Sequence, residues 1–213
     1  MKFILWNIYN GFQDGSKTEL LPALQRKEHS LNWVRQQDAD VVGLLELQDY
    51  KEADFISLFK GWNHQYGQLL KGVFPMGLSS RIPMGNTIHH TVNMSHGLIA
   101  CELGPITLML THIPPKKYTN RSVELRVLLK SILPILQHNR PLILMGDFNA
   151  SAQDPLLIAL QAIGLHPLIT SQICEQVFVS DSLLPITQAT IEWEEGLERL
   201  SDHLPIQIEI DLH

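Results

Sequence analysis

The chain has 213 residues, 45% hydrophobic and 18% charged, which is enough apolar sequence for a full core and excludes a disordered chain. The formal net charge of −6 gives no bulk attraction to DNA or to anionic membranes, although a bound cation could offset it at one site. The two cysteines, Cys101 and Cys174, lack the spacing of zinc ligands. Buried free thiols are the simpler interpretation, and a disulfide stays open.

The apolar runs of the chain are too short for a membrane span or a signal peptide, and this bears on where the protein is located. No stretch approaches the roughly 18 apolar residues of a membrane span, and the run at 1–6 is too short for a signal peptide. We therefore expect a cytoplasmic protein with no membrane span and no obligate protein partner. One domain over residues 1–213 is expected, because no linker, repeat or low-complexity segment interrupts the chain.

The expected elements alternate between short apolar runs and longer amphipathic ones. In chain order they are a strand at 2–6, a helix at 20–37, a strand at 41–45, a helix at 52–59, strand-like pieces between 73 and 111, a helix at 120–137, a strand at 142–145, a helix at 154–162, and strands at 173–179 and 204–210. The first helix is expected to bury the residues that recur at helical spacing, Leu20, Leu24, Leu31 and Val34.

Turn and cap residues separate several of these elements. Gly104 and Pro105 predict a hairpin turn between strands at 97–103 and 106–111. Asp154 is expected to cap the helix that starts at Pro155, and Pro134 to bend or shorten the helix at 120–137. Mixed strands flanked by two long helices imply two sheets packed face to face with helices outside, so periodicity alone predicts an α/β domain.

Two polar residues follow the strand at 142–145. Asp147 and Asn149 stand two apart, and their side chains would point the same way if the extended geometry continued. A carboxylate beside an amide can position one water, because the carboxylate accepts its proton while the amide holds its orientation. The alternative is an Asx turn at the strand end, which Gly146 would also serve.

Other strand ends carry polar groups of a similar kind. Asp202 and His203 precede the last strand, where they could bind a metal and a phosphoryl oxygen or form only a surface turn. Glu46 follows a buried strand, at an edge where open α/β sheets bind ligands; Mg²⁺ prefers one or two carboxylates, although a helix N-terminal acid is the alternative. Asn7 and His112 end two further strands, with an Asx turn and a structural histidine as alternatives. Five such ends together favour one site over five separate turns.

The ordered motifs resemble those of the endonuclease/exonuclease/phosphatase superfamily, which includes DNase I, exonuclease III, sphingomyelinases and inositol polyphosphate phosphatases. The resemblance spans the whole chain, and its two most specific signatures are Gly146-Asp147-Phe148-Asn149 and Ser201-Asp202-His203-Leu204-Pro205. The weaker matches, in chain order, are Leu5-Trp6-Asn7, Leu44-Leu45-Glu46-Leu47-Gln48, Leu78-Ser79-Ser80-Arg81-Ile82-Pro83 and Leu110-Thr111-His112.

The resemblance implies a fold and a metal centre. The fold is a four-layer α/β/β/α sandwich of two mixed, mainly antiparallel sheets, with the site at one end. Glu46 would be the main ligand of Mg²⁺, with Mn²⁺ as a second option. Asn7 and Asp202 would complete the metal shell, partly through water.

The resemblance also implies catalytic roles. Asp147, helped by Asn149, would orient and deprotonate the attacking water. His112 and His203 would hydrogen-bond the scissile phosphate and stabilise the charge of an in-line transition state.

The sequence departs from the family pattern in two places. The family carries an aspartate before an apolar strand, where it orients the catalytic histidine, and Glu175 takes that place here. Its longer arm could still pair with His203, and an exposed strand glutamate is the alternative. The chain is also short for the family, which implies trimmed substrate-binding loops.

Several charged and aromatic residues stay ambiguous. A basic cluster follows His112 and could grip a phosphate or form only a solvated loop; it comprises Lys116, Lys117 and Arg121, with Tyr118 between them. Arg81 carries the same two interpretations. Trp6 and Trp193 are expected to be packing residues, with the rim of the pocket as the alternative for Trp193.

The sequence therefore predicts a Mg²⁺-dependent phosphoesterase that hydrolyses a P–O bond by direct attack of an activated water. A nuclease-type phosphodiesterase is the leading hypothesis. Its partner would be its substrate, a phosphate ester that could be a nucleic acid. A fold does not settle a substrate, so a small-molecule or lipid phosphodiesterase or phosphatase is an alternative. A catalytically silent binding domain is another. A carboxylate-pair glycosidase would need neither a metal nor Asn149.

Overall fold

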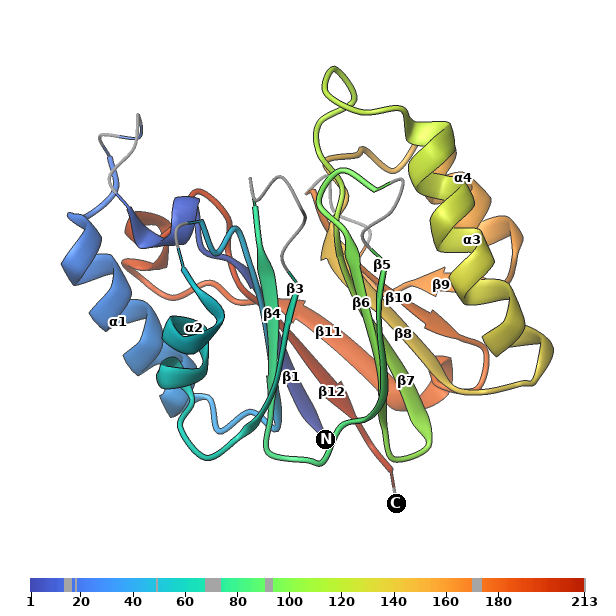
Figure 1. The fold of residues 1–213 in the computed structure, drawn as a ribbon, viewed down its shortest axis with the longest axis horizontal. Coiled ribbons are helices and arrows are strands. Elements are labelled where there is room, and N and C mark those ends of the chain that lie inside the picture. The colour runs from blue at the N-terminus through green and yellow to red at the C-terminus, as the bar shows by residue number, and fades with distance from the viewer. Residues whose placement is uncertain are drawn as a thin grey trace.

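A computed structural model describes residues 1–13, 17, 19–48, 50–67, 74–90, 94–169 and 174–212. Within these residues the strands form two six-stranded sheets (Figure 1). The first sheet contains, in spatial order, β11 (Thr187–Ile191), β12 (Ile206–Ile210), β1 (Lys2–Asn7), β2 (Val41–Leu45), β4 (Met76–Ser80) and β3 (Asn63–Gly67). The second contains β5 (Gly85–His90), β6 (Leu98–Leu103), β7 (Ile106–His112), β8 (Leu142–Asp147), β10 (Glu175–Ser180) and β9 (Leu165–Pro167).

Each sheet has one parallel pair at its centre. β1 runs parallel to β2 and β7 runs parallel to β8, and every other neighbouring pair is antiparallel. Helices α1 (Ala23–Gln36) and α2 (Glu52–Leu58) lie outside the first sheet, and α3 (Arg121–Gln137) and α4 (Pro155–Ala162) lie outside the second (Figure 1). The expected four-layer sandwich of two mixed, mainly antiparallel sheets is confirmed.

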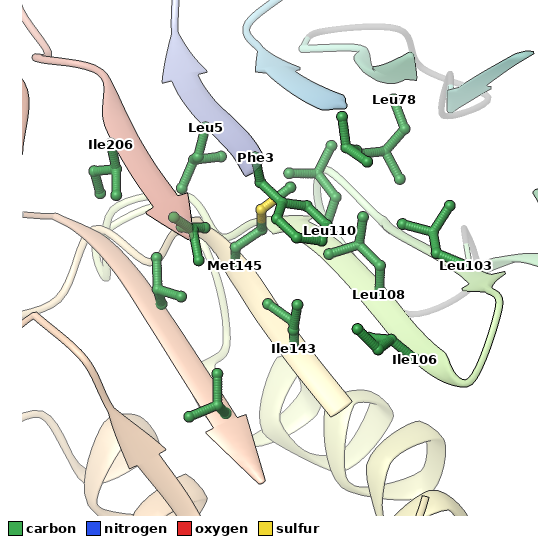
Figure 2. Close-up of a cluster of buried hydrophobic side chains, with 14 of the residues drawn as sticks. Phe3, Leu5, Leu78, Leu103, Ile106, Leu108, Leu110, Ile143, Met145 and Ile206 are labelled. Carbon is green, nitrogen blue, oxygen red and sulfur yellow. The ribbon is translucent and has the colours of Figure 1, made fainter. Parts of the chain in front are cut away.

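Three apolar layers hold the sandwich together, and β1 contributes to two of them. Phe3 and Leu5 point into the layer between the sheets, where Leu110 and Met145 come from the second sheet (Figure 2). Ile4 and Trp6, which alternate with them along β1, pack beneath α1 and α2 instead. Because side chains alternate across a strand, a strand covered on both faces is apolar throughout. A third layer fills the space under α3 and α4.

The first helix starts later than expected, at Ala23 rather than residue 20. Leu24 is 83% exposed, so the expectation that it lies on the buried face is wrong. The buried stripe runs through Arg26, Ser30, Leu31, Trp33 and Val34. Leu24 stands seven residues before Leu31, about 20° short of two full turns, so it lies at the margin of this stripe and is exposed in the first turn of the helix.

The cap expected at Asp154 is present, and Asn120 caps α3 in the same way, which was not predicted. The Asn120 side chain accepts a hydrogen bond from Ser122 N at 3.1 Å, and the Asp154 side chain accepts one from Leu156 N at 2.9 Å. Pro134 lies inside α3, which nevertheless continues to Gln137 and is not shortened.

No sequence pattern predicts the edge strands β3, β9 and β11. Each is short and carries polar residues, so its extended form depends on pairing with a neighbouring strand. Cys101 and Cys174 are free thiols. No helix in the described part of the chain is long and apolar enough to span a membrane.

Candidate functional site

The carboxyl ends of the two parallel pairs meet at one end of the sandwich. In the first sheet Asn7 ends β1 beside the end of β2, which Glu46 follows directly. In the second sheet His112 of β7 and Glu175 of β10 both lie in register with Asp147 of β8. The Asn7 side chain joins the two sheets, because its Nδ2 donates to Asp147 Oδ2 at 3.1 Å. Polar strand ends that are distant in the sequence thus form one cluster.

Asn7 is fully buried and separates two carboxylates. Its Nδ2 donates both to Asp147 and, at 3.0 Å, to Glu46 Oε1. Its Oδ1 accepts a hydrogen bond from Tyr9 N at 3.2 Å, which is the Asx turn of the alternative interpretation. The turn and the site therefore coexist, since the turn uses the amide oxygen and the site uses the NH₂ group. The role of Asn7 as a metal ligand stays a prediction.

Glu46 leaves the strand in a left-handed backbone conformation, with φ at 59°. Its carbonyl accepts a hydrogen bond from Gly11 N at 2.6 Å, and its Oε2 accepts one from Asn10 N at 3.0 Å. Gly11 is required there because a Cβ would lie 2.2 Å from Gln48 O. Burial raises the pKa of the Glu46 carboxyl, although the Asn7 and Asn10 hydrogen bonds oppose the shift. This carboxylate is held in place but poorly solvated.

Asp147 divides its two oxygens between a turn and the site. Oδ1 accepts a hydrogen bond from Asn149 N at 2.8 Å, while Oδ2 faces Asn7 and lies 3.7 Å from His112 Nε2. The Asx turn at this strand end is therefore also real. Burial raises the pKa of Asp147, with the His203 charge and the Asn149 N–H acting against it. The carboxylate is positioned to accept a proton.

Asn149 does not continue the strand. Its φ is 45°, so the expectation of parallel side chains at residues 147 and 149 is wrong, because a left-handed residue turns the chain out of the extended direction. Its Nδ2 donates to Ile113 O at 3.1 Å. The residue before Asp147 has to be glycine, because a Cβ at Gly146 would lie 1.9 Å from Thr111 O on β7.

His203 is held at both its ring and its backbone. Its Nδ1 pairs with Glu175 Oε1. Trp6 Nε1 donates to His203 O at 2.9 Å, and Ser201 Oγ accepts a hydrogen bond from His203 N at 3.2 Å. Ser201 Oγ also donates to the Asn7 carbonyl at 2.7 Å. Trp6 is buried as expected. Ser201 is a buried site residue whose own role the sequence reasoning missed, although it stood inside the recognised motif.

The pair of Glu175 and His203 is charged. Glu175 is only 3% exposed, so the alternative of an exposed strand glutamate is wrong. Burial alone would lower the pKa of His203, but Glu175, with further help from Asp147 and Asp202, raises it to about 9. Burial raises the pKa of Glu175, and its bond to His203 opposes that shift. The imidazole is therefore protonated at neutral pH.

His112 differs from His203 in charge. Burial, followed by the nearby His203 charge, lowers the pKa of His112 to about 3, so its ring is neutral. The ring of His96 packs edge-on against it at 4.4 Å between centroids, and Phe74 lies 5.8 Å away. Sequence reasoning missed both neighbours, because neither stands in a recognised motif. His112 can donate or accept a hydrogen bond without carrying charge.

A divalent cation fits the oxygen donors of this cluster. Ligand atoms of Glu46, Asp147 and His203 lie within 4.8 Å of one another. Burial raises the pKa of both carboxyls, and a cation between them would relieve that cost. His203 is protonated and paired with Glu175, so it suits proton donation better than metal binding. Asp202 stands at the rim, 3.7 Å from both Lys17 Nζ and His203 Nε2.

The other charged and aromatic candidates do not form one group. Lys116, Lys117 and Tyr118 are exposed, whereas Arg121 turns inward and bonds the chain after β8. Arg81 pairs with Asp38.

Trp193 is 72% exposed, so its expected packing role is wrong. The next residue, Glu194, accepts a hydrogen bond from Trp33 Nε1 at 2.9 Å, and this bond ties the segment to α1. The segment is therefore anchored through Glu194, and the neighbouring indole stays outside the core.

Comparison with known proteins agrees with this geometry. A model of the Endonuclease/Exonuclease/phosphatase family matches residues 4–203. Among solved structures, an AP endonuclease from Archaeoglobus fulgidus aligns at a TM-score of 0.71 and 14% identity over 100% of both chains. The 3′ phosphatase NExo from Neisseria, bound to a product DNA hairpin, aligns at 0.76 and 17% over 99% of both chains. A mannosyl-6-phosphatase from Bacteroides thetaiotaomicron aligns at 0.75 and 15% over 100% of both. No curated protein matches the sequence.

Proposed function

This chain belongs to the Endonuclease/Exonuclease/phosphatase family, and from that membership and the site geometry we propose that it is a metal-dependent hydrolase of phosphate esters. The observation that carries the proposal is the bridge from Asn7 Nδ2 to both Glu46 and Asp147, at 3.0 and 3.1 Å. This bridge gathers two carboxylates from different sheets around one point at the end of the sandwich. Such an arrangement of hard oxygen donors suits Mg²⁺ or Mn²⁺.

The metal would be held chiefly by Glu46, with Asp202 contributing, partly through water. Asn7 would contribute only through its Oδ1, which here accepts the hydrogen bond from Tyr9 N. When bound, it supplies positive charge that stabilises the phosphate and the leaving oxygen as negative charge develops. It would also offset the mutual repulsion of the half-buried Glu46 and the buried Asp147, whose carboxyls both have raised pKa values. The protein residues then have to supply the base, the proton donor and the orientation of the substrate.

Asp147 is the proposed base. Its Oδ1 is held by the Asn149 N–H at 2.8 Å, which leaves Oδ2 at the site end to accept a proton from the attacking water. His203, protonated and fixed by Glu175, would donate a hydrogen bond to a phosphoryl oxygen. The neutral His112 would donate a second one. Donors fixed before the reaction stabilise the transition state because they need no reorganisation.

A phosphodiester of the nuclease type is the first proposed substrate. The AP endonuclease supports this choice by its name, as does a second NExo structure, named a 3′–5′ exonuclease from Neisseria meningitidis. The NExo structure with a product DNA hairpin is named a 3′ phosphatase and supports a phosphate ester on DNA. The mannosyl-6-phosphatase supports a phosphomonoester as the second candidate. These identities lie below 20% and carry the fold alone, so the substrate has to be found by assay.

The test is hydrolysis of a substrate panel with Mg²⁺, with Mn²⁺ and with EDTA. The panel contains single- and double-stranded DNA, abasic DNA, DNA with a 3′ phosphate, RNA, sugar phosphates, inositol phosphates and sphingomyelin. Asp147→Asn is run beside the parent protein, with Asp181→Asn as the control because Asp181 is exposed and pairs with His166 away from the site.

We expect metal-dependent turnover that EDTA abolishes, and that Asp147→Asn reduces by about 10²- to 10⁴-fold. Asp181→Asn should retain the parent rate. Turnover that persists in EDTA would exclude the metal. Full activity of metal-loaded Asp147→Asn would exclude Asp147 as the base.

A further inference from the structure

Arg121 is the first residue of α3, and its guanidinium group reaches the chain that follows β8. One terminal nitrogen donates to Phe148 O at 2.7 Å and the other donates to Asn149 O at 2.6 Å. These two carbonyls belong to residues 147–150, which we call the Asp147 turn. Arg121 is half-buried there and is separate from the exposed Lys116 and Lys117 with which the sequence grouped it.

The position of Arg121 at the start of α3 does not explain why an arginine stands there. A positive charge at a helix N-terminus is unfavourable, because the unpaired N–H groups there already make that end positive. Asn120 provides the cap of α3 by accepting from Ser122 N. In the described part of the chain no carboxylate forms an ion pair with Arg121. The interactions seen for its guanidinium tips are the two carbonyls of the Asp147 turn.

The Asp147 turn needs such support because its backbone is unusual. Asn149 adopts φ 45°, a left-handed conformation that is uncommon outside glycine, although asparagine adopts it more readily than most residues. In this conformation its N–H holds Asp147 Oδ1 at 2.8 Å, and its Nδ2 donates to Ile113 O at 3.1 Å. The carbonyls of the turn point the other way, toward Arg121. The planar fork of arginine can hold two neighbouring carbonyls at once, which a lysine ammonium cannot do with the same geometry.

We propose that Arg121 is a positioning residue, which locks the Asp147 turn so that the Asp147 carboxylate stays aimed at the attacking water. The proposal rests on the phosphoesterase function proposed above. It differs from the phosphate-gripping role that the basic sequence suggested. A residue that grips substrate phosphate acts on KM, whereas a residue that holds the base in place acts on kcat.

The experiment compares three variants of the full chain on the best substrate from the panel. Arg121→Met removes the fork but keeps the length of the side chain, and Arg121→Lys keeps the charge without the fork. Arg126→Met is the matched control, because Arg126 is an exposed arginine on the same helix. For each protein we would measure kcat, KM, thermal unfolding and amide hydrogen exchange of residues 147–150.

We expect Arg121→Met to lower kcat by about 10- to 100-fold with KM changed less than about 3-fold, because a displaced base loses reaction geometry rather than binding. Arg121→Lys should restore little of this loss, and the amides of the Asp147 turn should exchange faster in both variants. Arg126→Met should match the parent in every measurement.

Three results would overturn the positioning role: an unchanged kcat, a raised KM with kcat retained, or unchanged exchange in the Asp147 turn. If Arg121→Met fails to fold, Arg121→Lys carries the same comparison. A parent protein with no turnover on any substrate would contradict the proposed function instead. The exchange measurement would still decide whether Arg121 holds the turn.

Discussion

Glu175 and His203 form an ion pair that crosses the sandwich, from β10 of the second sheet to the segment before β12 of the first. The carboxylate is buried, and it outweighs the burial that would otherwise keep the imidazole neutral. The site therefore contains one protonated histidine, His203, beside one neutral histidine, His112. This difference in charge has consequences that pH measurements can detect.

The first prediction concerns the alkaline limb of the pH–rate profile. His203 has a pKa raised to about 9, so its proton is present at neutral pH and is lost as the pH rises through that value. We expect kcat/KM to fall above about pH 9 for this reason. Glu175→Gln removes the main cause of the raised pKa and should move the limb to lower pH. Glu209→Gln, at an exposed glutamate of β12, should leave the limb where it is.

An alkaline limb that stays in place in Glu175→Gln would contradict the assignment of that limb to His203. The comparison should be made at saturating metal concentration, so that a change in metal affinity does not imitate a shift in pKa. Glu175→Asp would add information about reach, because its shorter arm tests whether this chain depends on the longer glutamate.

The second prediction concerns His112, whose pKa is lowered to about 3. We expect the nitrogen resonances of its ring to stay unchanged between about pH 8 and about pH 5, because the neutral form persists far below the ordinary histidine pKa. Nitrogen NMR would measure this, with His112→Asn used to assign the signals. A titration of His112 near pH 6.5 would show that the ring is more accessible to water than this packing allows.

The same shift affects stability. The unfolded chain binds a proton at His112 below about pH 6.5, whereas the folded chain does not. Protonation therefore favours unfolding, and this contribution to stability is lost as the pH falls from about 6.5 toward about 3, the folded pKa of His112. His96 has its pKa lowered to about 3 by burial and by His112, so it should act in the same direction.

The third prediction concerns metal binding by Glu46. Glu46→Gln removes a carboxylate whose pKa burial raises, but the glutamine NH₂ cannot accept one of the two hydrogen bonds from Asn7 and Asn10. These effects oppose each other, so the metal-free variant should stay close to the parent protein in stability. Its affinity for Mn²⁺ should fall by about 10-fold or more, because the main charged ligand is lost. Calorimetric titration with Mn²⁺ and thermal unfolding without metal would test both statements. An unchanged metal affinity would show that Glu46 is not a ligand.

The fourth prediction concerns the backbone contact between β7 and β8. Gly146→Ala would place a Cβ 1.9 Å from Thr111 O, and a backbone carbonyl in a paired strand has little room to move. We expect a loss of about 3 kcal/mol or more in the free energy of unfolding. Gly85→Ala is the control, since the nearest atom to its added Cβ lies 3.4 Å away. Urea denaturation of both variants provides the measurement, and equal midpoints would contradict the crowding at Gly146.

The sequence by itself determined the strands, the helices with strong caps and the polar residues at the strand ends. These features are local: β1 and β8 are apolar on both faces, and Asp154 and Asn120 cap the helices that follow them. Edge strands such as β3 and β11 carry no such pattern, since they become extended only by pairing with a neighbour.

Only the tertiary structure decided how the site is connected. In the folded chain Glu175 pairs with His203, and Asn7 bridges Glu46 and Asp147. Arg121 binds the Asp147 turn and is not part of a basic surface cluster. These contacts join residues that are far apart in the sequence, and they depend on how the two sheets stack and on where each chain turns after its strand. Spacing along one chain cannot show which oxygen of a carboxylate faces a turn and which faces the site, because packing from both sheets fixes that choice.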